Sequence, residues 1–381
     1  MSINYQENKM KKIVVITPTN PKDSYGHSGV VYSICNQIAK ENEIIWLKPK
    51  ISLWGVFCNV FSLLFVCLLK SLGYTVSHHP AMSKVYAAYL NKKLSVMEYD
   101  CILCFESMYF AYIKTEKPIL YRTDGVFHSM VNYYITNVPD FMVKCGDKVE
   151  CSALMKATYV LYPSKWVYDE TLKHYPGVSA EKLQVIESGA NIPWVEKHNE
   201  KKRLNEKCLQ LLFIGSDPKR KGVDVAIDCV KCLNEVFHRK AILTIVGGAF
   251  EYAPLSYVNY VGRINKNNVD ENKKFTDLLC MTDFLLFPTR AECAGIVSCE
   301  AAAYGIPVLA YRTGGVPSYV IDGINGHLFE PTLRGLDFAN YICSLQVEEY
   351  AKMSSNARFL YETKFNWDVW GDKVNKLIRE L

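Results

Sequence analysis

Short apolar runs alternate with segments of helical pattern along the first half of the chain. The first run, at residues 12–17, is followed by a loop and by a predicted helix over residues 30–40. Such alternation is typical of a parallel sheet whose strands are joined by helices. The predicted strands lie at residues 12–17, 43–47, 101–105, 119–121, 159–162 and 183–186.

A second alternating series follows a charged stretch at residues 196–207, which has few apolar side chains and predicts a linker. Its predicted strands lie at residues 211–215, 241–246, 258–261, 283–287 and 308–310. We therefore predict an α/β protein of two doubly wound parallel-sheet domains. Between them we expect a cleft lined by the loops at the carboxyl ends of the strands. The predicted parts are a first domain at 1–196, a linker at 197–207, a second domain at 208–360 and a terminal segment at 361–381.

The composition predicts a cellular compartment and argues against nucleic acid as a partner. The chain has 381 residues, 49% hydrophobic content, a net charge of +5 and a pI near 8.4. This mild basicity provides no nucleic-acid-binding stripe. Residues 1–12 are polar and lack the apolar core of a signal peptide, and the fourteen cysteines then indicate reduced thiols. We expect a cytoplasmic protein that does not bind nucleic acid.

One apolar segment, residues 51–69, begins at Ile51, ends at Leu69 and has lysines near both ends. Its length approaches that of a membrane span. A single crossing would, however, place strands of one predicted sheet on opposite sides of a bilayer. Two interpretations remain open. The segment is a helix lying on the inner face of the cytoplasmic membrane, which its aromatic residues favour, or a helix wholly buried in the first domain.

The strongest candidate chemistry lies between residues 284 and 307. A predicted strand ends in a polar loop that carries Glu292, and Gly295 then opens an Ala-rich helix that carries Glu300. Free backbone N–H groups at the start of a helix favour a phosphate, and a carboxylate within the helix can accept hydrogen bonds from a ribose diol. The alternative is a core helix with two incidental glutamates. The backbone donors in question belong to Gly295, Ile296 and Val297.

A second candidate loop runs from Gly215 to Gly222, between a predicted strand and a predicted helix. Lys221 and the backbone amides of this loop form a candidate phosphate cradle. The spacing is not that of a P-loop, because no Ser or Thr follows the lysine. A solvated basic loop is the alternative.

The run at 287–307 closely resembles the Glu-x7-Glu signature of retaining glycosyltransferases of family 4, and the match continues through 308–317 and 322–326. The resemblance is strong from 211 to 328 and weakest from 49 to 97, where an acceptor would be chosen. It implies the GT-B fold of two Rossmann-like domains with a cleft between them. It also implies that the segment 361–381 crosses back to the first domain.

The resemblance implies roles for the residues of the second domain. Glu300 would bind the ribose, Glu292 would hold hydroxyls of the donor sugar, and Lys221 would meet the donor diphosphate. The commoner form of this loop has arginine where this chain has Ser216, so Arg220 would supply the second positive charge or Ser216 would bind the phosphate through its hydroxyl.

The resemblance also points to two residues of the first domain. The loop at residues 26–29 is similar to the family's glycine loop, in which Gly29 would let the backbone approach the diphosphate. Asp124 follows a predicted strand where many family members have a histidine or aspartate that contacts the transferred sugar, and His128 is the second choice. A turn residue is the alternative for Asp124.

The resemblance implies a retaining hexosyltransferase that uses no cofactor. Because the sequence contains no Asp-x-Asp, a metal-bridged diphosphate is unsupported, and we expect the transfer to be metal-independent. The enzyme would move a sugar from a nucleoside diphosphate sugar to a hydroxyl of a lipid-linked or saccharide acceptor, in surface polysaccharide or glycolipid assembly. Candidate catalytic residues are Asp124, Lys221 and Glu292. A sugar-nucleotide epimerase and an inactive glycan-binding relative are the alternatives.

Overall fold

The structure is a computed structural model that describes residues 10–23, 29–76, 78–195, 207–251 and 253–381. Contacts between Cα atoms group the described residues into two units. Unit 1 comprises those within Met1–Tyr162, Val167–Ile186 and Gly371–Leu381, and unit 2 comprises those within Pro163–Trp166 and Glu187–Trp370. Most of the predicted linker at 197–207, and residues 26–28 of the predicted glycine loop, lie outside the described residues.

Unit 1 contains a six-stranded parallel sheet in the order β2-β1-β3-β4-β5-β6. The strands are β1 (Lys12–Ile16), β2 (Glu43–Leu47), β3 (Cys101–Cys104), β4 (Ile119–Arg122), β5 (Tyr159–Tyr162) and β6 (Leu183–Val185). The helices are α1 (Val30–Ile38), α2 (Leu53–Cys58), α3 (Val60–Ser71), α4 (Pro80–Leu94), α5 (Ser107–Phe110), α6 (Phe127–Met130), α7 (Asp140–Lys156), α8 (Lys165–His174) and the 3-10 helix η2 (Ala180–Lys182).

Unit 2 contains a second six-stranded parallel sheet in the order β12-β11-β10-β7-β8-β9. The strands are β7 (Leu209–Gly215), β8 (Ala241–Gly247), β9 (Val258–Gly262), β10 (Phe284–Phe287), β11 (Val308–Tyr311) and β12 (Gly326–Phe329). The helices are α9 (Pro218–Lys221), α10 (Val223–Glu235), α11 (Val269–Met281), α12 (Ile296–Ala303), α13 (Gly335–Ser344), α14 (Val347–Thr363) and the 3-10 helix η3 (Val316–Ser318). A last helix, α15 (Trp367–Glu380), begins in unit 2 and ends in unit 1.

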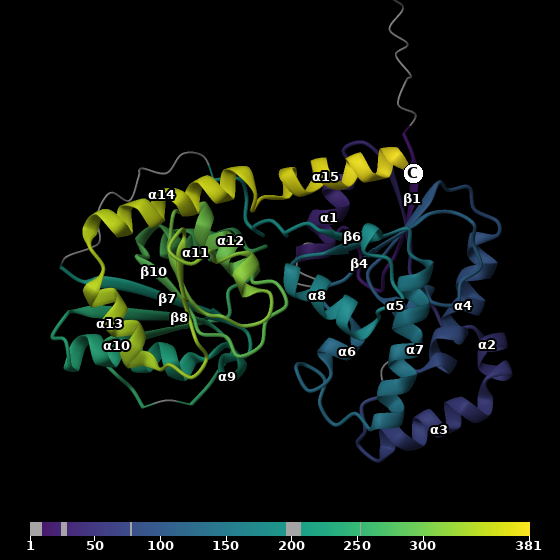
Figure 1. The fold of residues 1–381 in the computed structure, drawn as a ribbon, viewed down its shortest axis with the longest axis horizontal. Coiled ribbons are helices and arrows are strands. Elements are labelled where there is room, and N and C mark those ends of the chain that lie inside the picture. The colour runs from purple at the N-terminus through teal and green to yellow at the C-terminus, as the bar shows by residue number, and fades with distance from the viewer. Residues whose placement is uncertain (1–9, 24–28, 77, 196–206, 252) are drawn as a thin grey trace, which may run out of the picture. The chain divides into compact units, whose positions relative to one another are not determined.

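Both faces of the unit 2 sheet are buried, which is why its strands are continuous apolar runs. Along β10, Phe284 and Leu286 pack into one core cluster with α10 and α13, whereas Leu285 and Phe287 pack into another with α11 and α12. Figure 1 shows these two helix layers on opposite sides of the sheet. The alternation of side chains along a strand therefore builds two separate cores.

The strand order of unit 2 creates one reversal point. From β7 the chain moves to β8 and β9 on one side, and from β10 it moves to β11 and β12 on the other, while β7 and β10 are neighbours. In open parallel sheets, ligands bind beyond the carboxyl ends of the two strands where the order reverses. The loops after β7 and β10 therefore mark the favoured binding position of this unit.

The predicted helix over 51–69 is two helices, α2 and α3, which are separated at Asn59. Among their residues only Gly55, Val66 and Leu69 are buried. The interpretation of a helix wholly buried in the first domain is therefore wrong. No helix in the described part of the chain has the length and hydropathy needed to cross a bilayer.

The end of α15 is tied to unit 1 by polar contacts. Asn375 donates from Nδ2 to the Gln37 carbonyl oxygen at 3.1 Å, and Asn42 donates to Asn375 Oδ1 at 3.1 Å. A Cβ on Gly371 would lie 2.7 Å from Gln37 Oε1, so glycine permits this close approach. Residues 371–381 consequently group with unit 1.

Candidate active site

The loops after β7 and β10 are packed directly against each other. Gly222 ends α9 with a φ of 81°, and a Cβ there would lie 2.1 Å from the carbonyl oxygen of Pro288. Only glycine satisfies both the left-handed backbone and this contact. Asp217 caps α9 by accepting a hydrogen bond from the Arg220 N–H at 3.1 Å. Together these features fix the position of Lys221, the last residue of α9.

Lys221 and Glu292, which are 71 positions apart in sequence, form an ion pair at this point. Their side chains are 14% and 13% exposed. The Lys221 ammonium also lies 4.8 Å from the centre of the Phe287 ring. Burial lowers the pKa of Lys221, and the charge of Glu292 opposes that effect. The sequence predicted both residues as site residues, and the structure brings them into contact.

Arg220, the residue before Lys221 in α9, reinforces this cluster. Its Nη1 donates to the carbonyl oxygen of Ala291 at 2.6 Å and lies 3.9 Å from the Glu292 carboxylate. The Glu292 backbone is held as well, because its carbonyl oxygen accepts a hydrogen bond from the Gly315 N–H at 2.8 Å. Two cations and one carboxylate therefore occupy a fixed place beyond β7 and β10.

Helix α12 starts beside this cluster. Gly295 is its N-cap with a φ of 112°, and Ile296 and Val297 are its first two residues. The first N–H groups of a helix have no helical acceptors and carry the positive end of the helix dipole. The hydroxyl of Ser298 in the same turn is buried and has no hydrogen-bond partner among the described residues. This turn therefore offers backbone and hydroxyl donors for an anion, and the sequence analysis missed Ser298.

Glu300 lies one turn further along α12 and forms the second lysine–glutamate pair of unit 2. Its side chain is 5% exposed, and Lys266 Nζ lies 2.5 Å from its Oε1. The same ammonium lies 4.4 Å from the centre of the Phe275 ring. Lys266 follows β9, and no motif in the sequence marked it. Only the tertiary structure shows that this lysine reaches Glu300.

Ser216, which stands where the family more often has arginine, begins the loop after β7 and is exposed. A Cβ on Gly248 would lie 2.3 Å from the Ser216 carbonyl oxygen. The loops after β7 and β8 are therefore in close contact at this point. In the described structure the two cations near Glu292 are Lys221 and Arg220.

The remaining predicted residues belong to unit 1. Gly29 is the N-cap of α1 with a φ of 81°. Asp124 follows β4 and is ion-paired with Arg122, whose side chain is 4% exposed, whereas the Asp124 side chain is 54% exposed. A buried guanidinium thus orients a carboxylate that is open to solvent.

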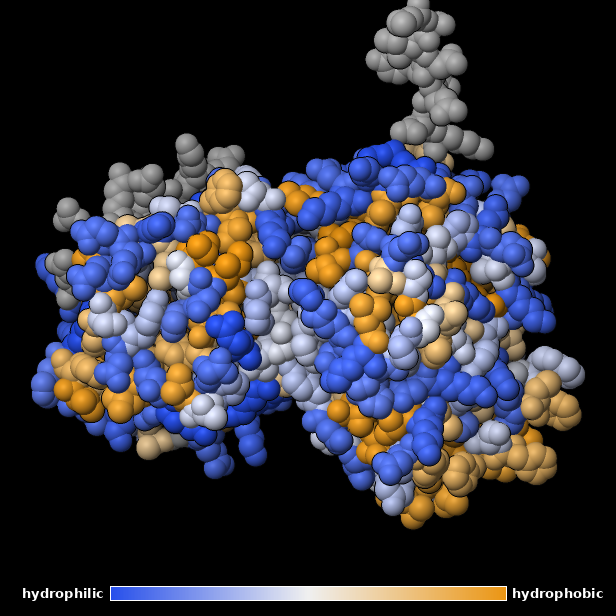
Figure 2. Space-filling model, in the orientation of Figure 1, coloured by the Kyte–Doolittle hydropathy of each residue, from blue (hydrophilic) through white to orange (hydrophobic). Residues whose placement is uncertain are grey.

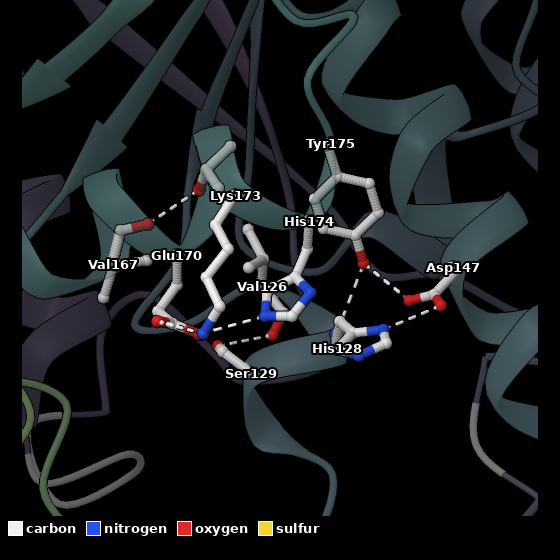
Figure 3. Close-up of polar contacts among 10 residues, drawn as sticks. Val126, His128, Ser129, Asp147, Val167, Glu170, Lys173, His174 and Tyr175 are labelled. Carbon is white, nitrogen blue, oxygen red and sulfur yellow. Dashed lines mark hydrogen bonds and ion pairs between the residues drawn. The ribbon is translucent and has the colours of Figure 1, made fainter.

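His128, the second choice beside Asp124, belongs to a different cluster that links α6, α7 and α8 (Figure 3). Its Nδ1 lies 2.9 Å from Asp147 Oδ2, and the Tyr175 hydroxyl donates to Asp147 Oδ1 at 2.8 Å. The rings of His128 and His174 stack with centroids 4.0 Å apart, and His174 Nε2 lies 3.1 Å from Glu170. These contacts join three helices of unit 1.

Comparisons with known proteins bear on the family and the fold of this chain. Residues 195–360 match the family model described as "Glycosyl transferases group 1". An uncharacterized 41.2 kDa protein in the cps region of Klebsiella pneumoniae is 30% identical over 161 residues, which are 40% of this chain and 42% of that protein. The lipopolysaccharide glucosyltransferase WaaG of Escherichia coli is 32% identical over 128 residues, 33% of this chain and 34% of WaaG. The matched regions thus span less than half of these relatives.

Solved structures extend the likeness to both units. The crystal structure of Anabaena HepE in complex with UDP-glucose superposes with a TM-score of 0.66 at 17% identity, over 97% of this chain and 100% of HepE. At that identity the likeness shows the fold alone. Together with the family match over unit 2, it confirms the predicted fold and family. Residues 195–360 of this chain belong to the group 1 glycosyl transferases, and the chain has the GT-B fold.

Proposed function

We propose that this protein is a retaining hexosyltransferase that moves a sugar from a nucleoside diphosphate sugar to a hydroxyl acceptor. The observation that carries the proposal is the contact between Lys221 and Glu292 at the reversal point of the unit 2 sheet. A cation, a carboxylate and a helix N-terminus meet where such sheets bind nucleotides. The name of the HepE complex supports the donor class, because that protein binds UDP-glucose.

The diphosphate of the donor would be held by Lys221, Arg220 and the first N–H groups of α12 at Gly295, Ile296 and Val297. Ser298 would add its unpartnered hydroxyl. Lys221 would exchange its contact with Glu292 for a phosphate oxygen, which leaves Glu292 to accept hydrogen bonds from sugar hydroxyls. Ser216 and Gly29 would approach the diphosphate from their own loops.

Glu300 would accept hydrogen bonds from the ribose diol. Its carboxylate is held inside α12 by burial and by Lys266, so little rotational freedom is lost on binding. Asp124, oriented by the buried Arg122, would position the transferred sugar.

The reaction breaks the bond between the anomeric carbon and the donor phosphate oxygen and forms a bond from that carbon to the acceptor oxygen. Retention follows if the acceptor attacks the face that the phosphate leaves and its proton passes to the departing phosphate. A covalent intermediate on Glu292 is the other retaining route. In either route, fixed positive groups near the leaving phosphate stabilise the charge that develops there. We propose that Lys221 supplies this charge without a metal ion.

The names of the relatives favour an acceptor in surface polysaccharide or glycolipid assembly. One relative lies in a cps region and another is a lipopolysaccharide glucosyltransferase. A lipid-linked or saccharide hydroxyl at the cytoplasmic side of the membrane is therefore the acceptor that we propose.

Calorimetry with UDP-, GDP- and ADP-linked sugars tests the donor class. We expect sugars linked to one of the three nucleotides to bind and the corresponding free sugar not to bind. NMR should show that the sugar released from that donor retains its anomeric configuration. Release should be unchanged in excess chelator. Absence of binding by every nucleotide sugar would overturn the proposal, and loss of release with chelator would overturn its metal-free part.

A further inference from the structure

Helices α2 and α3 present large apolar side chains to solvent. Six of them are between 55% and 87% exposed, although buried positions are the usual place for such residues. Figure 2 shows apolar colour along the edge of unit 1 where Figure 1 places these helices. We call this surface the α2–α3 face, and its defining residues are Leu53, Trp54, Phe57, Phe61, Leu64 and Leu68.

The helices are attached to the rest of unit 1 by their opposite side. A Cβ on Gly55 would lie 2.9 Å from Val85 Cα, so glycine lets α2 lie directly on the backbone of α4. Val66 and Leu69 are the buried residues of α3. Because this packing fixes the rotation of both helices, the apolar residues of the α2–α3 face are held outward. A contiguous apolar patch of this kind marks a contact site.

The charge around the face selects the partner. No Asp or Glu occurs between Glu43 and Glu98, whereas six lysines do. Lys48, Lys50 and Lys70 flank the two helices and are exposed. Lysines beside exposed tryptophan and phenylalanine are typical of helices that lie at the surface of an anionic bilayer.

We propose that the α2–α3 face docks on the surface of a membrane that contains anionic lipids. The six apolar side chains enter the boundary between headgroups and acyl chains, and the three lysines contact lipid phosphates. A second copy of the chain is a less suitable occupant. In a two-fold interface the same surface meets itself, so the lysines would face lysines without an acidic partner from this segment.

Vesicle cosedimentation of the full chain, without donor, tests the docking. We expect binding to vesicles of phosphatidylcholine with phosphatidylglycerol and much weaker binding to phosphatidylcholine alone. The triple variant Phe57→Ser/Phe61→Ser/Leu64→Ser should bind at least about a hundredfold more weakly, because three buried side chains are lost from the bilayer. Phe359→Ser is the control, since Phe359 is 61% exposed on α14 of unit 2.

The electrostatic part has its own variant. Lys48→Gln/Lys50→Gln/Lys70→Gln should weaken binding to the anionic vesicles roughly a hundredfold, because each lysine near such a surface contributes about fivefold. The control Lys352→Gln/Lys373→Gln/Lys376→Gln makes the same change of charge at exposed lysines on α14 and α15. It should bind like the wild type.

The docking would be overturned if the wild-type protein did not bind anionic vesicles, or if both triple variants bound them like the wild type. It would also be overturned if analytical ultracentrifugation showed a dimer that the serine variant dissociates while its vesicle binding is unchanged. Circular dichroism and thermal unfolding of each variant show whether a loss of binding reflects loss of fold, and Trp54→Phe gives a milder variant whose loss of quenching by brominated lipid reports insertion. Because no donor is present, these results stand apart from the proposed glycosyl transfer.

Discussion

The two units bury glutamates in opposite ways. In unit 1, Glu150 is 1% exposed and accepts hydrogen bonds from the Ser107 and Tyr121 hydroxyls at 2.7 and 3.0 Å. Burial raises its pKa to about 7. In unit 2, Glu292 and Glu300 are each ion-paired with a lysine.

The partner decides what each carboxyl can do. Neutral hydroxyls satisfy the Glu150 carboxyl but offset only part of the cost of burying its charge, so it serves to join β4, α5 and α7. Lysine partners leave charged groups that can exchange one contact for another when an anion or a diol arrives. The two pairs of unit 2 lie at the carboxyl end of the sheet, whereas Glu150 lies within a helix interface. We infer that the ion-paired glutamates belong to binding and the hydroxyl-bonded one to folding.

The largest effect is expected at Lys221. Lys221→Ala removes the cation that we propose for the leaving phosphate and leaves Glu292 without its lysine, so turnover should fall about a hundredfold to a thousandfold. Donor turnover at saturating donor is the measurement. Lys231→Ala, an exposed lysine on α10, should keep wild-type turnover. Turnover of Lys221→Ala within tenfold of the wild type would mean that Lys221 has a structural role and not the proposed catalytic one.

The next largest effect is expected on the stability of unit 1 as the pH changes, through Glu150. Because the folded-state pKa of Glu150 is raised from 4.5 to about 7, the folded state holds its proton more tightly. Its contribution to stability is fully present below pH 4.5 and is lost as the pH rises through about 7, a change on the order of 3 kcal/mol. Glu150→Gln should remove this dependence, measured by hydrogen exchange of β4 amides at pH 5 and pH 7.5.

Exposed Glu181 on η2 provides the control for that measurement. Glu181→Gln should leave the pH dependence of β4 as in the wild type, and β10 amides of unit 2 should not respond to Glu150→Gln. A β4 profile that is the same in Glu150→Gln and wild type would mean that Glu150 does not bind the proton in question.

A smaller loss is expected at Glu300. Glu300→Ala removes the carboxylate that we assign to the ribose, and a hydrogen bond to a charged group is worth about 1.5–3 kcal/mol, so donor affinity should fall about tenfold to a hundredfold. Calorimetry with the preferred donor is the measurement, and Glu362→Ala on the exposed side of α14 is the control. Unchanged affinity would reject the ribose role.

The smallest effect on donor affinity is expected at Lys266, and it tests whether this lysine contacts the donor or only pairs with Glu300 in the free protein. If Lys266 pairs with Glu300 only in the free protein and is replaced by the donor, Lys266→Met should lower the unfolding temperature of the free protein and tighten donor binding. The gain in donor affinity should be about fivefold at most, because the lysine is 34% exposed. Weaker donor binding in Lys266→Met would instead show that Lys266 contacts the donor itself.

The sequence anticipated much of the local structure. Apolar runs located eleven of the strands to within about two residues, because a buried parallel strand must be apolar on both faces. Gly295 marked the start of α12, because the left-handed backbone of this N-cap favours glycine. The strand β12 was missed, because its residues Gly326–Phe329 include a glycine and a histidine that interrupt the apolar pattern.

What the sequence alone determined was which segments form strands and helices and which residue types stand at their ends, because hydrophobic period and capping are properties of neighbouring residues. The tertiary structure decided which ends meet. Strand order places β7 beside β10 and so brings Lys221 to Glu292 across 71 positions, and the β9 loop brings Lys266 to Glu300 across 34. It also decided that α2 and α3 keep their apolar side outward. These contacts depend on the packing of whole layers, which no local period specifies.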